Sequence, residues 1–138
     1  MRVVLDTNIL LQSLPRKSKI RPVWDAFLKQ EIRLIITPSI LLEYEEIIAN
    51  KTSPQVSANI ISLINEAVNS IFIHIYYEWN VITDDPDDNK FFDAAVAGNA
   101  EYLVTNDSHF KQALQVGFPR VNIINGDQFL DIIQNNDQ

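Results

Sequence analysis

The sequence predicts an α/β fold built around a parallel sheet with helices on both faces. Short apolar segments suited to buried strands alternate with segments of helical spacing along the chain, and this alternation is typical of parallel sheets. Two helix starts are clearly marked, because Thr37-Pro38 and Ser53-Pro54 each place an N-capping residue before a proline that fits the first helical turn. In such sheets, ligands bind beyond the carboxyl ends of the strands.

The N-terminal half contains two expected strands and three expected helices. Arg2–Asp6 is apolar until its last residue and predicts a short buried strand, and Arg33–Thr37, rich in isoleucine, predicts a second. Pro22 opens the first expected helix between them. The two capped helices are expected over Pro38–Ala49 and Pro54–Val68.

The next expected elements surround a polar turn. Ile71–Tyr77 alternates imperfectly and predicts a strand, and Asp84–Asn89 is a polar turn with a proline inside it. Phe91–Asn99 follows as a helix that ends near a glycine. Glu101–Thr105 is then expected to be a strand.

The C-terminal segment predicts two more helices around a strand. Ser108–Val116 is expected to be a helix closed by a glycine, and Val121–Ile124 a strand. Asp127 can cap a last helix that runs through Ile133. The tail Gln134–Gln138 is expected to fray.

Composition limits the class of protein. The 138 residues carry a net charge of −7, with 46% hydrophobic and 21% charged residues, which fits one compact domain over residues 1–138. Zero cysteines exclude disulfides, zinc–thiolate sites and thiol nucleophiles, and three glycines leave no room for a glycine-rich phosphate loop. No apolar run approaches the roughly 18 residues of a membrane span. The expectation is therefore a soluble, cytoplasmic protein without a membrane partner.

Charged residues are segregated into two segments. A basic run near residue 20 contains no acid, while the stretch from Asp84 to Asp107 contains seven acids and one base, Lys90. Such runs are often plain solvated surface. Acids beside strongly apolar segments, however, need a compensating partner. The basic residues that could instead reach a nucleic-acid backbone are Arg16, Lys17, Lys19, Arg21 and Lys90.

Four carboxylates converge on one rim of the predicted sheet. Asp6 and Asp107 each follow an apolar strand, Asp88 begins the helix before the second of these strands, and Glu43 lies one turn into a helix, four residues after Ser39. Each alone has an ordinary explanation, as a helix cap or an exposed helical acid. Together they form an oxygen-only site that suits Mg²⁺ or Mn²⁺. The pattern therefore favours metal-dependent phosphodiester hydrolysis. Asp93 could either join this site or face water.

Several motifs resemble those of PIN-domain ribonucleases. Val4-Leu5-Asp6-Thr7-Asn8-Ile9-Leu10 resembles the opening motif and Ser39-Ile40-Leu41-Leu42-Glu43 the second. The segments Asp85–Ala95 and Ala100–Asp107 resemble the last two motifs, in the form found in the toxin branch of toxin–antitoxin systems (VapC-like). The resemblance spans residues 2 to about 125.

The resemblance implies a fold, an activity and partners. The fold is a three-layer α/β/α sandwich with a central, mainly parallel sheet, and the activity is Mg²⁺- or Mn²⁺-dependent endonucleolytic cleavage of single-stranded RNA. Toxin members are held inactive by a cognate antitoxin protein and often form homodimers. One departure is His109, which stands where many relatives have Asp or another small polar residue.

The resemblance also implies roles for individual residues. Asn8 and Thr105 match polar positions that support the site by hydrogen bonding, as does Ser39 in the second motif, and Asp93 matches a position that is often acidic and would be a secondary metal ligand. The catalytic and metal-binding acids would be Asp6, Glu43, Asp88 and Asp107.

Two other classes of function remain open. The first is a non-catalytic PIN-like module that binds RNA or a protein without cutting. The second is an aspartyl-phosphate domain. A haloacid-type phosphatase needs an acid two residues after its nucleophile, but position 8 is asparagine, and a receiver domain needs an acidic pair where Asp6 stands alone.

Overall fold

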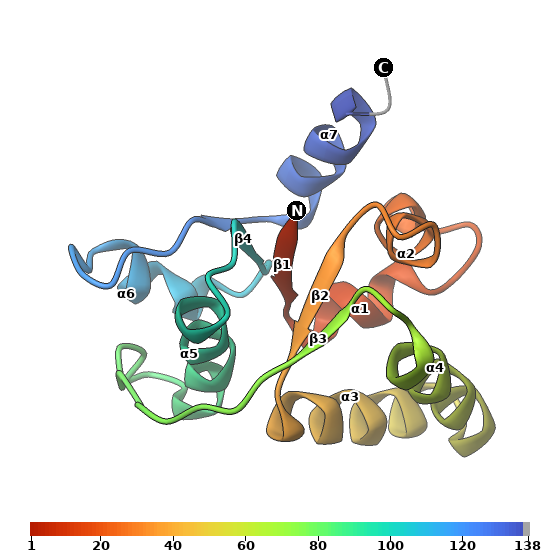
Figure 1. Ribbon diagram of the computed structural model, residues 1–138, viewed down its shortest axis with the longest axis horizontal. Coiled ribbons are helices and arrows are strands. Elements are labelled where there is room, and N and C mark those ends of the chain that lie inside the picture. The colour runs from red at the N-terminus through yellow and green to blue at the C-terminus, as the bar shows by residue number, and fades with distance from the viewer. Residues whose placement is uncertain (137–138) are drawn as a thin grey trace.

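A five-stranded, all-parallel sheet forms the centre of the molecule. The computed structural model describes residues 1–136. The strand order is β3-β2-β1-β4-β5 (Figure 1). All four pairings are parallel, as the alternation of strands and helices predicted. The strands are β1 (Arg2–Leu5), β2 (Arg33–Ile36), β3 (Ser70–Phe72), β4 (Tyr102–Val104) and β5 (Ile123–Ile124).

Helices cover both faces of this sheet and give the predicted three-layer sandwich. Helix α5 lies on one side of β1 and β2, and α1 and α2 lie on the other (Figure 1). Helices α3 and α4 pack against each other below the sheet in this view. The helices are α1 (Thr7–Ser13), α2 (Arg21–Leu28), α3 (Pro38–Lys51), α4 (Pro54–Glu66), α5 (Asn89–Ala97), α6 (Lys111–Leu114) and α7 (Gly126–Asn136), with 3₁₀ turns η1 (Pro86–Asp88) and η2 (Ser108–Phe110).

The strand order reverses beside β1. The chain forms β1, β2 and β3 in one direction, then crosses back so that β4 lies on the other side of β1. Leu5 is paired with Val104 at the carboxyl ends of these two neighbouring strands. Asp6 and Asp107 follow those ends, so both lie at the switch point where parallel sheets bind ligands.

The predicted helix caps position the elements that surround this point. The Thr37 hydroxyl accepts a hydrogen bond from the Ile40 N–H at 3.2 Å, and the Ser53 hydroxyl accepts one from the Val56 N–H at 3.1 Å. Each hydroxyl satisfies a backbone donor that the helix itself cannot pair. The starts of α3 and α4 are therefore fixed locally by sequence.

A close approach fixes α5 against the sheet. Gly98 follows the last residue of α5, and a Cβ atom there would lie 2.8 Å from two side-chain carbons of Ile35. Because Ile35 is fully buried, it has little space to yield. Only glycine allows α5 to sit this close to β2.

The structure corrects several expected boundaries. Helix α1 was not predicted, and the strand expected over Ile71–Tyr77 is only Ser70–Phe72, because Tyr76 and Tyr77 are exposed and pair with no strand. The helix expected over Ser108–Val116 is a 3₁₀ turn followed by α6, which ends at Leu114.

The cap of the last helix also differs from the prediction. Asn125 accepts a hydrogen bond from the Gln128 N–H at 2.8 Å, and the Gln128 side chain accepts one from the Asn125 N–H at 2.8 Å. This reciprocal pair is a capping box, so Asp127 lies inside the first turn. Helix α7 continues past Ile133 to Asn136. Of the tail expected to fray, residues 137–138 lie outside the described residues.

Candidate functional site

The structure brings the four predicted acids to the carboxyl edge of the sheet. Asp6 follows β1, Glu43 lies on α3, Asp88 lies at the start of α5, and Asp107 follows β4. The carboxylates influence one another: Asp107 and Glu43 add to the rise in the pKa of Asp6, and Asp107 and Asp6 add to that of Asp88. These separate segments therefore form one region of concentrated negative charge.

Asp6 is buried but has hydrogen-bond donors of its own. It is 6% exposed, and its Oδ2 accepts a hydrogen bond from the Thr105 hydroxyl at 2.7 Å. Burial raises the pKa of Asp6, while the hydrogen bonds from Thr105 and from the Asn8 backbone lower it. Thr105 and Asn8 thus support Asp6, Thr105 through its side chain and Asn8 through its main chain.

Glu43 is also partnered within the protein. Its Oε1 forms an ion pair with Lys90 Nζ at 2.7 Å, and its Oε2 accepts a hydrogen bond from the Thr7 hydroxyl. The next residue, Tyr44, is fully buried and donates its hydroxyl to the Leu5 carbonyl at 2.5 Å. This hydrogen bond ties α3 to the end of β1, so Glu43 is held beside the Asp6 strand.

Asp88 has the least satisfied carboxylate of the four. It is 9% exposed, and its Oδ2 is the one buried side-chain polar atom among residues 1–135 that lacks a hydrogen bond. Burial raises the pKa of Asp88 to about 8, with the nearby carboxylates of Asp107, Asp85 and Asp6 adding to the rise. A buried oxygen without a donor is costly unless something else neutralises it.

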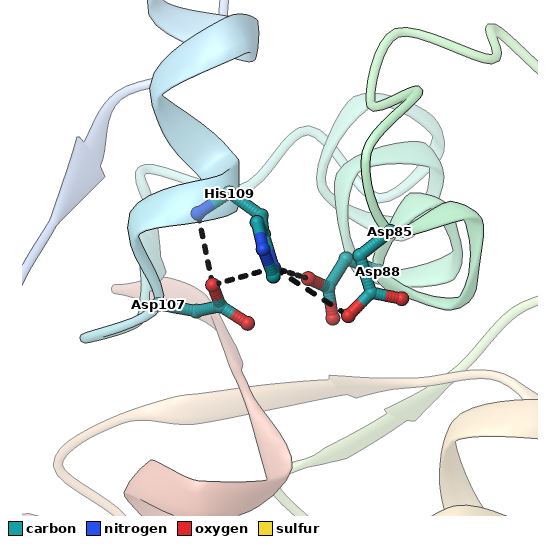
Figure 2. Close-up of side chains that lie close together, drawn as sticks. All are labelled: Asp85, Asp88, Asp107 and His109. Atoms are coloured by element: carbon teal, nitrogen blue, oxygen red, sulfur yellow. Dashed lines mark hydrogen bonds and ion pairs between the residues drawn. The ribbon is translucent and has the colours of Figure 1, made fainter.

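Asp88 faces a compact group that comes from two turns of the chain. Figure 2 shows Asp85 and Asp88, at the two ends of η1, pointing toward Asp107 and His109 at the start of η2. One ligand atom from each of these four residues lies within 4.8 Å of the others. Asp107 Oδ1 accepts a hydrogen bond from the His109 N–H at 2.8 Å, and the Asp107 N–H donates to the Thr105 hydroxyl at 3.0 Å.

This group has the donors that a divalent cation requires. Three carboxylates and one imidazole converge, and the unpartnered Oδ2 of Asp88 supplies a deprotonatable oxygen that the protein itself leaves free. A cation here would stabilise the ionised form of Asp88, whose pKa burial and the nearby carboxylates raise. The residues present therefore fit a metal ion.

Asp93 and Ser39 lie to one side of this group. Asp93 is 4% exposed and its Oδ1 accepts a hydrogen bond from the Trp79 N–H at 3.1 Å, so it anchors the long segment between β3 and η1. Burial raises the pKa of Asp93. Ser39 and Asp93 line a separate cavity of about 390 Å³, together with Lys90. The structure thus does not bring Asp93 into the group of Asp88 and Asp107.

The predicted basic residues also differ in their positions relative to the acids. Arg21 forms an ion pair with Asp25 at 2.9 Å and donates to the Leu14 carbonyl, so it fixes the start of α2. Lys17 and Lys19 line a cavity of about 620 Å³ that also contacts Asn106, the neighbour of Asp107. Lys19 forms an exposed ion pair with Asp127 at 3.2 Å, and Arg16 is exposed.

Asp85 and His109 are the group members that sequence reasoning did not select. Asp85 stood among four acids of one turn, and nothing in the pattern separated it from Asp84 or Asp87. His109 lies two residues after Asp107, and that spacing was the available signal, because a 3₁₀ turn returns its backbone N–H to the preceding carboxylate.

Comparisons with known proteins identify the family and the fold. The family model described as PIN domain matches residues 2–109. A chain in the crystal structure of VapBC2 from Rickettsia felis, bound to a DNA fragment from their promoter, is similar with a TM-score of 0.62 at 18% sequence identity. The similarity covers 91% of this chain and 98% of that chain, and at this identity it shows the fold. The comparison with curated proteins found no match.

Within residues 1–136, no helix combines the length and apolarity needed to cross a membrane. The family match runs from the start of β1 to His109 within η2 and therefore includes all four predicted acids. This chain belongs to the PIN domain family.

Proposed function

We propose that this chain is an Mg²⁺- or Mn²⁺-dependent endoribonuclease that hydrolyses phosphodiester bonds of single-stranded RNA. The observation that carries the proposal is the buried, unpartnered Oδ2 of Asp88, which faces Asp107 at the switch point of the sheet. Membership of the PIN domain family supports a nuclease. The acids and the family point to the same class of chemistry.

The four acids have two different roles toward the cation. In this proposal Asp88 and Asp107 bind the ion directly, while Asp6 and Glu43 supply further negative charge from the neighbouring strand and helix. When bound, a divalent ion activates water for attack and offsets the negative charge of the phosphodiester. Thr105 holds Asp6 and the Asp107 main chain in one orientation, which preserves the spacing of the acids.

Basic side chains near the acids would bind the RNA backbone. Lys90 lies 2.7 Å from Glu43, so it is close enough to the site to meet a phosphate there. Arg16, Lys17 and Lys19 follow α1, and the cavity that Lys17 and Lys19 line reaches Asn106 beside Asp107. We assign Arg21 to holding its own loop, because Asp25 and the Leu14 carbonyl already engage it.

Cleavage of single-stranded RNA in Mn²⁺ tests this proposal. Asp107→Asn and Asp88→Asn should each slow cleavage on the order of 10³-fold, because loss of a carboxylate at the ion removes several kcal/mol of charge stabilisation. EDTA should abolish cleavage by the wild type. Asp131→Asn, on the exposed face of α7, is the matched control and should cut normally.

The outcomes separate the proposal from its alternatives. The products should carry 5′-phosphate and 3′-hydroxyl ends, which end-specific ligation can identify. RNA binding without any cleavage would favour the non-catalytic module. If the wild type cuts and both acid variants cut at the same rate, the assignment of these acids is wrong.

We further propose that the chain is the toxin of a toxin–antitoxin pair. The motifs of the toxin branch and the fold shared with a chain of VapBC2 support this role. Induced expression should arrest growth for the wild type and not for Asp107→Asn. Co-expression of a small antitoxin protein encoded beside this chain should restore growth. We also propose that the chain forms a homodimer, which light scattering of the purified protein would measure. Normal growth with active wild-type enzyme would refute the toxin role alone.

A further inference from the structure

We infer that the His109 imidazole is a ligand of the bound ion, and that the site consequently takes Mn²⁺ in preference to Mg²⁺. This inference rests on the proposed metal-dependent function and deepens it. Oxygen ligands alone suit both ions, whereas an imidazole nitrogen adds a donor that first-row transition ions accept more readily than Mg²⁺ does. His109 would therefore set the identity of the metal.

The position of the imidazole supports this role. His109 Nδ1 lies 3.0 Å from Asp107 Oδ1, 3.5 Å from Asp85 Oδ2 and 3.8 Å from Asp88 Oδ2. One nitrogen thus faces all three carboxylates of the group, as Figure 2 shows. The side chain comes from the turn that Asp107 itself caps, so its backbone is fixed relative to that carboxylate.

The spacing matches that of ligands around a single ion. Six ligands at bond lengths of about 2.1 Å are separated by roughly 3.0 Å when adjacent and about 4.2 Å when opposite. The three distances from Nδ1 lie between these two values. The distances from Nδ1 are therefore compatible with one ion shared by Asp88, Asp107 and His109.

The unpartnered oxygen of Asp88 supplies independent support. Asp88 is 9% exposed, and its Oδ2 points into the group without receiving a hydrogen bond. The nearest nitrogen to it among these residues is His109 Nδ1 at 3.8 Å, too far for a hydrogen bond. A cation between the two atoms would serve both, whereas the imidazole alone does not satisfy the carboxylate.

Pulsed electron paramagnetic resonance of Mn²⁺-loaded protein tests the nitrogen ligand directly. The full chain with one equivalent of Mn²⁺ should show ¹⁴N modulation from a directly bound imidazole, and His109→Asn should lose it. The chain contains one other histidine, His74, which is exposed on the segment after β3. His74→Asn is therefore the matched control and should keep the modulation.

Calorimetric titration with Mn²⁺ and with Mg²⁺ tests the preference. His109→Asn should lower the Mn²⁺ affinity by about tenfold and the Mg²⁺ affinity by less than about threefold. Circular dichroism of each variant verifies folding. If His109→Asn does not fold, the ¹⁴N signal of the wild type and of His74→Asn still decides the question.

Three results would overturn the inference. Mn²⁺ bound to the wild type without ¹⁴N modulation means that His109 is not a ligand, and the proposed function then stands. Tighter Mn²⁺ binding by His109→Asn means that the imidazole competes with the ion. If the wild type binds no Mn²⁺, or if Asp107→Asn binds Mn²⁺ as tightly as the wild type does, both the inference and the proposed metal-dependent activity are wrong.

Discussion

The two halves of the acidic region differ in how the protein treats its carboxylates. Asp6 and Glu43, the N-terminal acids, have partners in Thr105, Thr7 and Lys90. The C-terminal acids, Asp85, Asp88 and Asp107, face one another and a histidine, and Asp88 keeps an oxygen without a donor. The N-terminal acids thus have partners within the protein, whereas the C-terminal acids keep an unpaired oxygen that a cation could neutralise. Metal affinity should therefore depend chiefly on the C-terminal acids.

The largest expected difference is in metal affinity, between a variant of a C-terminal acid and a variant of an N-terminal acid. We expect Asp88→Asn to lower the Mn²⁺ affinity by about 100-fold, because it removes the free oxygen, and Glu43→Gln to lower it by less than about tenfold. Calorimetric titration measures both. Equal losses in the two variants would show that the halves hold the ion alike.

In the metal-free protein, Asp88 should make stability fall as pH rises. Burial raises the pKa of Asp88 to about 8 in the folded protein, whereas the unfolded chain releases this proton near the ordinary aspartate pKa of 3.8. The unfolded state then binds fewer protons, so the metal-free wild type loses stability as pH rises between these values.

Asp88→Asn should remove this loss. At pH 8 in EDTA we expect the free energy of unfolding of the variant to exceed that of the wild type by about 2 kcal/mol, with little difference near pH 4. Urea unfolding at several pH values measures it. Parallel pH profiles for the two proteins would contradict the account of Asp88.

Thr105 connects the two halves and offers a smaller effect. Its hydroxyl donates to Asp6 at 2.7 Å and accepts from the Asp107 N–H at 3.0 Å. Thr105→Val should cost about 1.5 kcal/mol of unfolding free energy, because a buried donor and an acceptor lose their partner. Thr105→Ser keeps the hydroxyl and is the control. A valine variant as stable as the serine variant would show that the hydroxyl contributes little.

The ion pair of the N-terminal acids should give the smallest effect. The Lys90 and Glu43 side chains are 23% and 26% exposed, so solvent weakens their attraction. A double-mutant cycle of Lys90→Met and Glu43→Gln should give a coupling free energy of about 0.5–1 kcal/mol in EDTA. A coupling of zero would mean that Glu43 does not depend on its lysine.

Local signals explain why most of the fold could be predicted. Thr37 and Ser53 mark their helix starts with hydrogen bonds to residues three positions on, which any sequence reader can locate. Helix α1 was not predicted because it begins at Thr7 directly after the strand, has only seven residues, and has no side-chain hydrogen bond capping its start. The strand predicted over Ile71–Tyr77 is too long, because the residues after Phe72 alternate in burial without pairing with a strand. Ile73 and Ile75 are partly buried against the core.

The site was predictable only in part for a related reason. Asp6 and Asp107 follow strands, and the switch point of a parallel sheet brings strand ends together. The meeting of Asp85 with His109, by contrast, depends on how η1 and η2 pack across the molecule. No spacing along the chain encodes that contact, so tertiary structure was needed to find it.

Gly98, which has no side chain, influences the position of one of the acids. Helix α5 carries Asp88 before its first residue and contacts Ile35 at its far end, where a Cβ would also lie 3.0 Å from the Ala94 carbonyl oxygen. A methyl group at position 98 would push this end of α5 away from Ile35 and tilt the helix. The tilt would move Asp88 at the other end of α5. A substitution at this remote glycine would consequently displace Asp88 while every charged side chain stays intact.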